Sequence, residues 1–294
     1  MNTDKLVPTR VADLENWLDR FAPARTAEEW DAVGLQIGHP DDPVQAVLLT
    51  LDITPEAVRL ARQHQASLII CHHPPLFEPL ASLRLDQPEQ RMLVELAAAG
   101  TSVLAAHTNL DQAAGGVADC LAEKLAGAFG AKSRLEPLGP YGRLIVLDKP
   151  VRWLRLLDAG QRSLGAGGCL QNTADSPLVR RIGVYPGSFS ADFIPDAVAA
   201  GAEAVICGEC KHSTGLLLTL HGLAQAAFGH DVTERVVLEP LAEKLRAAFP
   251  QIRFAVCPGL DYNESAFRVS RTAAGVSRKA AHEESPGSAG QGAG

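Results

Sequence analysis

The sequence predicts an α/β fold with two related lobes and mixed, mostly parallel sheets. Apolar runs typical of buried strands alternate with helical patterns over residues 47–126, which is the pattern of parallel strands joined by crossover helices. After a less regular middle, the same alternation resumes from residue 182. A short internal echo supports two related halves, because PEAV precedes a strand that ends in CHH and PDAV precedes one that ends in CGECKH.

Each element of the first half has a local signal. Val11, Leu14 and Leu18 recur at helical spacing, and Thr54-Pro55 supplies the cap and first-turn proline of a helix start. The predicted elements are, in order, a helix at 11–22, a Gly-punctuated segment at 28–38, a strand at 47–53, a helix from 55, a strand at 67–71, a helix near 88–99, a strand at 101–106 and a helix at 115–126.

The second half is predicted to begin less regularly, because Gly and Pro punctuate residues 130–178. The later predicted elements are a strand and turn at 182–187, a helix at 191–201, a strand at 202–208, a long apolar helix at 213–228, a helix at 233–249 and a closing strand at 252–257. We assign residues 1–126 and 231–271 to the first lobe and 127–230 to the second. The Gly/Ser-rich residues 272–294 are predicted to be a disordered tail.

Composition and charge narrow the classes of function. Hydrophobic residues make up 46% of the 294 residues, as in globular proteins with a sizeable core, and the net charge is -7. This acidic balance argues against a protein that grips the nucleic-acid backbone, and it suits a site that holds cations on acidic ligands. The six cysteines are scattered, which indicates reduced thiols. The first ten residues, MNTDKLVPTR, lack a signal-peptide pattern. No apolar run reaches the ~20 residues of a membrane span. We therefore expect a cytoplasmic protein without membrane or direct nucleic-acid contact.

Two adjacent histidines follow the second predicted strand, in the segment LIICHHPPLF. The carboxyl ends of parallel strands are where α/β proteins build their sites. Because neighbouring residues of an extended chain point in opposite directions, His72 and His73 would each serve one of two ions, unless one bends inward at the Pro74-Pro75 turn. The alternative is a surface loop with one core histidine.

Two further segments supply side chains of the kinds that bind metals. His107 and Asp111 follow the next strand in AAHTNLD, where the alternative is a loop turned by its polar side chains. His230 and Glu234 of GHDVTE are four residues apart and share a helix face, which is the geometry of a His/carboxylate ligand pair. The alternative there is a helix cap.

Together these segments predict a site for two cations. Four imidazoles and two carboxylates are too many for one tetrahedral zinc, and they suit two ions roughly 3–4 Å apart, bridged by a carboxylate and a water. Nitrogen and oxygen ligands admit Zn, Mn, Fe, Co or Ni. The six residues are His72, His73, His107, Asp111, His230 and Glu234.

A rival constellation is CGECKH, in which Cys207, Cys210 and His212 are the reactive residues. A CxxC pair can bind zinc or carry out redox chemistry, although no second CxxC exists to complete a structural zinc site. Glu209 and Lys211 of the same segment could line the predicted cleft. No phosphate-binding glycine loop is present, and the aromatic residues are too few and too scattered for a nucleic-acid stacking platform.

The chain resembles the Nif-three-like dinuclear metal-centre family, whose members often bear the name GTP cyclohydrolase I type 2 homologue. The resemblance rests on five segments in the family's order and spans most of the chain. It departs at Ala32, where the family usually has Asn, and before Gly229-His230, where the family's acidic residue is absent. The five segments are EEWDAVGLQIG, CHHPPLF, AAHTNLDQAAGGV, GECKHS and GHDVTE.

The resemblance implies two α/β lobes around a central metal-binding cleft, and a homohexamer built as a trimer of dimers. It also implies His107 as a sixth contact or as a hydrogen-bond partner of a ligand. Glu234 or His107 is expected to shuttle a proton. The ligands it implies for two divalent ions are His72, His73, Asp111, His230 and Glu234.

Three functions follow as hypotheses. The first is a metal-dependent hydrolase that acts on a nucleotide such as GTP and opens the guanine ring at C8, as the family name implies. The second is a non-catalytic metal-binding scaffold or regulatory protein. The third and weaker one is a two-metal phosphoester hydrolase.

Overall fold

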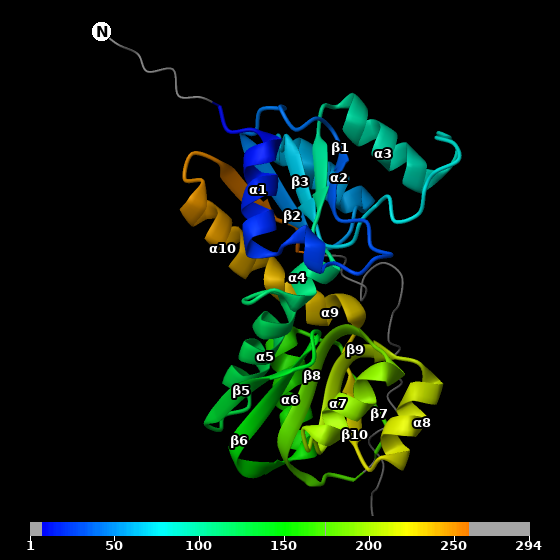
Figure 1. The fold of residues 1–294 in the computed structure, drawn as a ribbon, viewed down its shortest axis with the longest axis vertical. Coiled ribbons are helices and arrows are strands. Elements are labelled where there is room, and N and C mark those ends of the chain that lie inside the picture. The colour runs from blue at the N-terminus through cyan, green and yellow to red at the C-terminus, as the bar shows by residue number, and fades with distance from the viewer. Residues whose placement is uncertain (1–7, 174, 259–294) are drawn as a thin grey trace, which may run out of the picture. The chain divides into compact units, whose positions relative to one another are not determined.

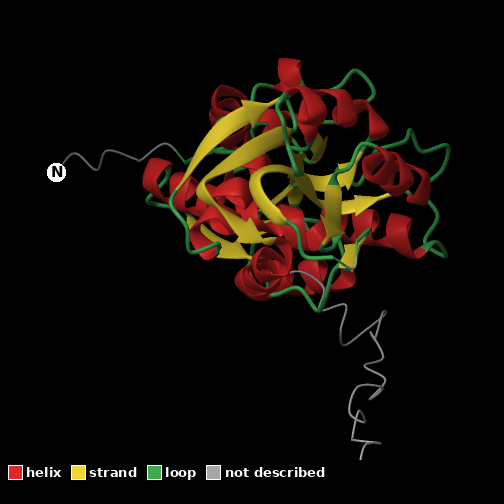
Figure 2. Cartoon of the chain, turned by 90° about the horizontal axis from the view of Figure 1, so that it is seen from below, coloured by secondary structure: helices red, strands yellow, loops and turns green. Residues whose placement is uncertain are grey.

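Two β-sheets, each covered by helices on both faces, organise the chain in the computed structural model (Figures 1 and 2). The structure describes residues 8–173 and 175–258, so the predicted tail at 272–294 lies outside the described residues. Mixed, mostly parallel sheets between helices confirm the predicted α/β class. The exact boundaries between the lobes stay predictions.

The first sheet has five strands in the order β1-β4-β3-β2-β11, and only β1 is antiparallel. Its last strand returns from the far end of the described chain to pair with β2. The strands are β1 (Gly34–Ile37), β2 (Ala46–Thr50), β3 (Leu68–Cys71), β4 (Ser102–Ala105) and β11 (Arg253–Val256). The covering helices are α1 (Val11–Phe21), α2 (Pro55–His64), α3 (Pro88–Ala98) and α10 (Leu238–Ala248).

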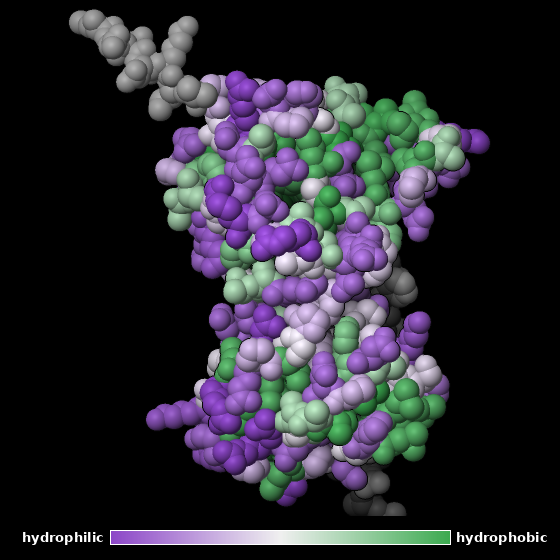
Figure 3. All heavy atoms as spheres, viewed as in Figure 1, coloured by the Kyte–Doolittle hydropathy of each residue, from purple (hydrophilic) through white to green (hydrophobic). Residues whose placement is uncertain are grey.

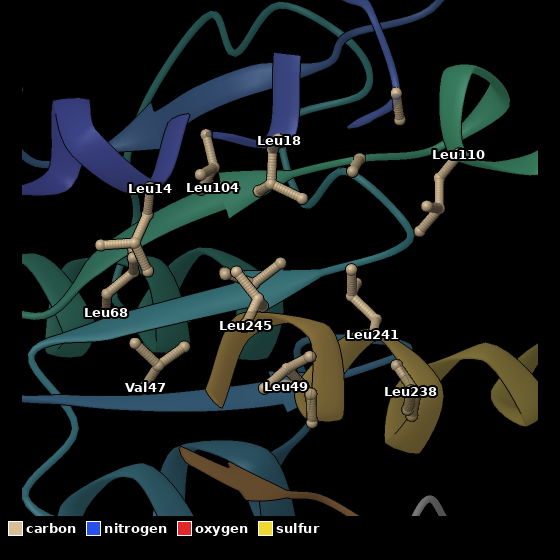
Figure 4. Packing of buried hydrophobic residues seen from close by; sticks show 14 of the residues in the cluster. Leu14, Leu18, Val47, Leu49, Leu68, Leu104, Leu110, Leu238, Leu241 and Leu245 are labelled. Carbon is tan, nitrogen blue, oxygen red and sulfur yellow. The ribbon is translucent and has the colours of Figure 1, made fainter. Parts of the chain in front are cut away.

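The core on one face of this sheet joins the two ends of the described chain. Leucines of α1 and of α10 lie against inward-facing residues of the strands, as Figure 4 shows for Leu14, Leu245 and Leu68. Each fully buried leucine contributes roughly 1.5–3 kcal/mol to folding. The carboxyl-terminal helix and strand therefore belong structurally with the amino-terminal segments.

The second sheet has six strands in the order β5-β6-β8-β9-β10-β7. The central strands β8, β9 and β10 are parallel, and the remaining pairs are antiparallel. The strands are β5 (Ser133–Leu138), β6 (Gly142–Arg152), β7 (Leu170–Gln171), β8 (Leu178–Phe189), β9 (Ala204–Cys210) and β10 (Ala224–Ala227). The helices are α5 (Val117–Ala128), α6 (Trp153–Leu164), α7 (Ile194–Ala199) and α8 (His212–Leu220), with a 3-10 turn at Ala191–Phe193.

The prediction of an irregular middle is wrong, because residues 130–178 contain β5, β6, α6 and β7. The prolines that suggested loops occupy positions where a strand tolerates them. Pro137 lies on β5, an edge strand, and Pro150 lies where the pairing of β6 with β8 is interrupted. A proline has no N–H to donate, which costs little at such positions.

Two predicted helices are also corrected. The predicted helix at 213–228 ends at Leu220, and β10 follows after Gly222, whose positive φ ends the helical path. Short apolar segments such as that of β10 cannot be assigned to strand or helix by periodicity alone. The predicted helix at 233–249 is divided into α9 (His230–Glu234), a 3-10 turn (Arg235–Val237) and α10, whose first turn contains Pro240.

The surface seen in Figure 3 mixes hydrophilic and hydrophobic residues over both sheets. Among residues 8–173 and 175–258, no helix has the length and apolar character that crossing a bilayer requires.

Candidate metal centre

The first sheet places its metal-ligand side chains at the carboxyl ends of two neighbouring strands. β3 and β4 are parallel, and Cys71 pairs with Ala105, so the segments that follow both strands begin at the same edge. His72 and His73 follow β3 directly, and His107 follows β4. The short helix α4 (Thr108–Gln112) then turns the chain and brings Asp111 back toward the same edge.

The second sheet contributes α9, which packs against β8 and β9 with almost no space between them. A Cβ on Gly187 would lie 2.0 Å from Oε1 of Glu234, and one on Gly208 would lie 2.6 Å from Oγ1 of Thr233. Gly187 also has a φ of +57°, and its N–H donates to Thr233 Oγ1 at 3.0 Å. Glycine at both positions therefore lets α9 lie close enough to present His230 and Glu234.

The carboxylate of Glu234 lies among three imidazoles. Its Oε2 is 3.0 Å from His73 Nε2 and 3.9 Å from His72 Nε2, and its Oε1 is 3.1 Å from His230 Nε2. On the other side, His72 Nε2 is 3.5 Å from Asp111 Oδ1. Side chains from both sheets thus converge on one centre.

All six predicted residues are brought together. They form three overlapping groups, in each of which one nitrogen or oxygen atom per residue lies within 4.8 Å of the others. The groups are His72, His73 and His107; His73, His230 and Glu234; and His72, Asp111 and Glu234. His72 and His73 share the first group, and each also belongs to one group without the other. The groups are compatible with both sequence alternatives, in which each histidine serves one of two ions or one bends inward at the Pro74-Pro75 turn.

Every imidazole of the cluster has its Nδ1 held by an oxygen acceptor. Metal-binding histidines usually show this arrangement, because an acceptor at Nδ1 fixes the tautomer in which Nε2 is free to bind. The acceptors are Ala106 O for His72 (2.9 Å), Asp52 Oδ1 for His73 (2.7 Å), Asp31 Oδ1 for His107 (2.8 Å) and Glu209 Oε1 for His230 (3.0 Å).

The sequence prediction did not include the three acceptor side chains, Asp31, Asp52 and Glu209, among the site residues. It also did not include the two glycines. Asp52 lies just beyond the carboxyl end of β2, where the strand-end rule could have found it. Asp31 belongs to the EEWDAVGLQIG segment, and Glu209 had been considered only as a residue lining the cleft. Gly187 and Gly208 carry no local signal, since their role depends on α9 packing above them.

The buried centre contains polar atoms without partners. His72, Asp111 and Glu234 are nearly inaccessible, with exposures of 1%, 8% and 4%. Within the described part of the chain, His72 Nε2 and Asp111 Oδ1 have no hydrogen-bond partner, and Glu234 Oε2 has only His73 Nε2 within hydrogen-bond distance, at 3.0 Å. Leaving buried polar atoms unpaired is costly, and cations among these side chains would satisfy them, so the residues present fit a metal centre.

Comparison with known proteins identifies the family. Residues 9–258 match the sequence profile of Duf34/NIF3 (NGG1p interacting factor 3). The chain belongs to the Duf34/NIF3 family. The match covers both sheets and all six residues of the cluster.

Relatives of the Duf34/NIF3 chain include proteins named GTP cyclohydrolase 1 type 2 homolog. The one from Nostoc sp. is 34% identical over 251 residues, which cover 81% of this chain and 92% of the relative. The one from Clostridium perfringens is 29% identical over 240 residues, which cover 81% and 91%. Among solved structures, the Bacillus cereus protein related to NIF3 matches with a TM-score of 0.79 at 20% identity, covering 89% of this chain and all of that one, which establishes the fold.

Burial and charge set the protonation of the cluster. Burial lowers the pKa of His72 to about 4, which keeps this imidazole neutral and able to bind a cation. Burial, followed by the charge of Glu234, raises the pKa of Asp111 well above its ordinary value. Burial also opposes the charge on Glu234, but hydrogen bonds with His230 and His73 outweigh it and lower its pKa. In the metal-free protein, bound protons therefore offset the negative charge of the carboxylates, and cations would take over this role on binding.

The cysteine motif lies outside this cluster. Cys207 is buried in the second sheet, where Gln225 Nε2 lies 3.7 Å from its sulfur. No group of possible metal ligands among the described residues contains a cysteine, and all six cysteines are free. A hydrogen bond with Cys207 lowers the pKa of Cys210 to about 7. The structure thus gives no support to a zinc site at this motif.

Proposed function

We propose that five of the clustered side chains hold two divalent cations, with His107 beside them, and that the site hydrolyses a nucleotide such as GTP. The five are His72, His73, Asp111, His230 and Glu234. The observation that carries this proposal is the convergence of two unpartnered buried atoms, His72 Nε2 and Asp111 Oδ1, with the carboxylate of Glu234 and with imidazoles whose Nδ1 atoms are already engaged. Such a donor set is costly without a cation and well prepared for one.

Two ions suit the cluster better than one. The three ligand groups overlap without coinciding, and together they offer six side chains, more than a four-coordinate ion accepts. Glu234 belongs to two of the groups, with Oε2 near His73 and Oε1 near His230, so its carboxylate would help to hold both cations. The ligand atoms are nitrogen and oxygen, which admits Zn, Mn, Fe, Co or Ni.

The chain's own residues prepare the chemistry. When bound, a cation pair lowers the pKa of water toward neutrality and so supplies the nucleophile. Asp31 holds Nδ1 of His107 at 2.8 Å and accepts the N–H of Thr108 at 3.0 Å, which fixes the ring orientation. We assign proton transfer to His107 rather than to Glu234, because Glu234 is 4% exposed and lies among three imidazoles.

The choice of GTP rests on the relatives' name, GTP cyclohydrolase 1 type 2 homolog. A hydrolase of that kind would open the guanine ring at C8.

We also propose a cytoplasmic homohexamer, a trimer of dimers, which light scattering would reveal as six times the chain mass of 31.1 kDa.

The test is turnover by the metal-loaded protein. Each candidate metal is supplied, GTP and a panel of other nucleotides are incubated with the protein, and products are identified by mass spectrometry. His72→Ala should abolish product, whereas His221→Ala, at an exposed position after α8, should leave it unchanged. Full metal loading without product from any nucleotide would refute the hydrolase and favour the metal-binding scaffold.

A further inference from the structure

Two exposed aromatic rings lie beside the metal cluster. Trp30 is 59% exposed and Phe77 is 43% exposed, although large apolar rings are normally covered. Their ring centroids lie 6.3 Å and 6.2 Å from that of His107. The two rings come from segments far apart in the sequence, one before β1 and the other after β3.

The turn that carries Trp30 is held by its neighbours on both sides. The N–H of Glu28 donates to Thr108 Oγ1 at 3.0 Å, and its carboxylate accepts from Tyr141 Oη at 2.5 Å. Asp31 closes the turn with an N–H bond to Glu28 O at 3.0 Å and anchors His107 and Thr108 through its carboxylate. Trp30 is therefore exposed on a fixed turn, since the residues around it are tied to the same segment that supplies His107.

Phe77 is also constrained. It follows Pro74 and Pro75, whose rings fix φ, and it lies four residues after His73, which Asp52 holds at 2.7 Å. The centroids of Phe77 and Trp30 are 5.7 Å apart, with the ring planes inclined by 56°. At this spacing the rings are in contact, and a third ring does not fit between them. They form one continuous aromatic wall.

We propose that this aromatic wall, Trp30 with Phe77, is a stacking surface for a planar heteroaromatic ring such as a nucleobase. The ligand's ring lies against the exposed faces of the wall, and its reactive atoms reach the cluster at His107. Aromatic faces bind any nucleobase by stacking, so this surface needs no polar group that reads guanine. The inference rests on the proposed function, because it names how the same site would hold its substrate.

The position of the wall favours a small planar ligand over a second copy of the chain. Both rings contact His107, so whatever covers them also lies against the cluster. A bound nucleobase accounts for the exposed rings and for their place beside the reactive centre together. A second copy would account for the exposure alone, and it becomes one outcome of the test.

The experiment measures the affinity for the ligand. Calorimetry on the metal-loaded full chain compares GTP with inorganic triphosphate, which has no base. We expect tighter binding of GTP by wild type, a loss of at least about fivefold in Trp30→Ala, and recovery of most of it in Trp30→Phe. Triphosphate affinity should stay unchanged in all variants. Leu220→Ala, which removes an 81% exposed leucine from α8, is the matched control and should change neither affinity.

Metal content and assembly size are measured for every variant, because Trp30 adjoins the Asp31 that orients His107. The proposal is wrong if wild type binds no nucleoside triphosphate more tightly than triphosphate. It is also wrong if Trp30→Ala weakens both ligands equally, or changes only the size of the assembly. Base-dependent binding without any hydrolysis would support the stacking surface and contradict the proposed hydrolase function. Hydrolysis with unchanged turnover and KM in Trp30→Ala would support the hydrolase function and contradict the stacking surface.

Discussion

The two sheets supply the metal cluster in different ways. The first presents histidines directly after β3 and β4, where the edge of any parallel sheet collects side chains. The second presents His230 and Glu234 on a five-residue helix that reaches the centre only because Gly187 and Gly208 have no side chains. One contribution follows from the general geometry of parallel strands, whereas the other depends on a particular close contact.

The largest effect on metal binding is expected from removing Glu234, one of the two ligand side chains that the second sheet supplies. Glu234 belongs to two of the three ligand groups, so Glu234→Ala should lower bound metal to less than about half of the wild-type stoichiometry. Elemental analysis of purified protein checks this. Glu239→Ala, an exposed carboxylate on α10, is the control and should retain full loading. Wild-type metal content in Glu234→Ala would show that Glu234 is not needed to hold the ions.

The close contact of α9 is tested by adding one methyl group. Gly187→Ala should destabilise the fold by about 1–3 kcal/mol, because the new Cβ overlaps Glu234 Oε1 and the residue has a positive φ. Gly165→Ala is the matched control, since Gly165 has a φ of +69° but nothing within 4 Å of the added Cβ. Thermal unfolding of both variants separates the steric cost from the backbone cost. Equal losses in the two would remove the argument for tight packing.

The first sheet is tested through the acceptor that orients its histidine. Asp52→Ala leaves Nδ1 of His73 without its partner at 2.7 Å, and we expect metal affinity to fall about 10–100-fold. Chelator competition measures the affinity. Asp86→Ala, on an exposed carboxylate distant in sequence from the cluster, should have no effect. A change of less than about threefold in Asp52→Ala would mean that the backbone alone places His73.

The smallest expected effect is a pH dependence of the stability of the metal-free protein. It arises from one imidazole of each sheet, His73 and His230. Burial opposes the charge on His73 and His230, but hydrogen bonds with neighbouring carboxylates raise their pKa values to about 10 and about 9. In the metal-free protein these ion pairs stabilise the fold fully below about pH 6.5, and their contribution is lost as the pH rises through 9 to 10.

Metal affinity should follow the opposite trend. A cation must displace these protons, so affinity should rise with pH between about 6.5 and 9, and protons should be released at pH 7. Calorimetry in two buffers of different ionisation enthalpy counts the released protons. An affinity independent of pH over this range would contradict the protonation assigned to both imidazoles.

Sequence reasoning was most successful where the chemistry is local. His230 and Glu234 share a helix face at a spacing of four, and His72 and His107 each follow an apolar strand, so all four could be selected without knowing the fold. It failed at β10, where a short apolar run has the same composition in a buried strand as in a helix. Only the pairing with β9 and β7 in the folded sheet distinguishes the two.

The sequence by itself determined the α/β class and the six side chains of the cluster, because periodicity and residue type are properties of short segments. Tertiary structure alone decided which acceptors orient the imidazoles, why Gly187 and Gly208 are required, and that Trp30 and Phe77 meet beside His107. These are contacts between residues distant in the chain. No local pattern encodes such contacts, since they exist only once the strands have set the segments side by side.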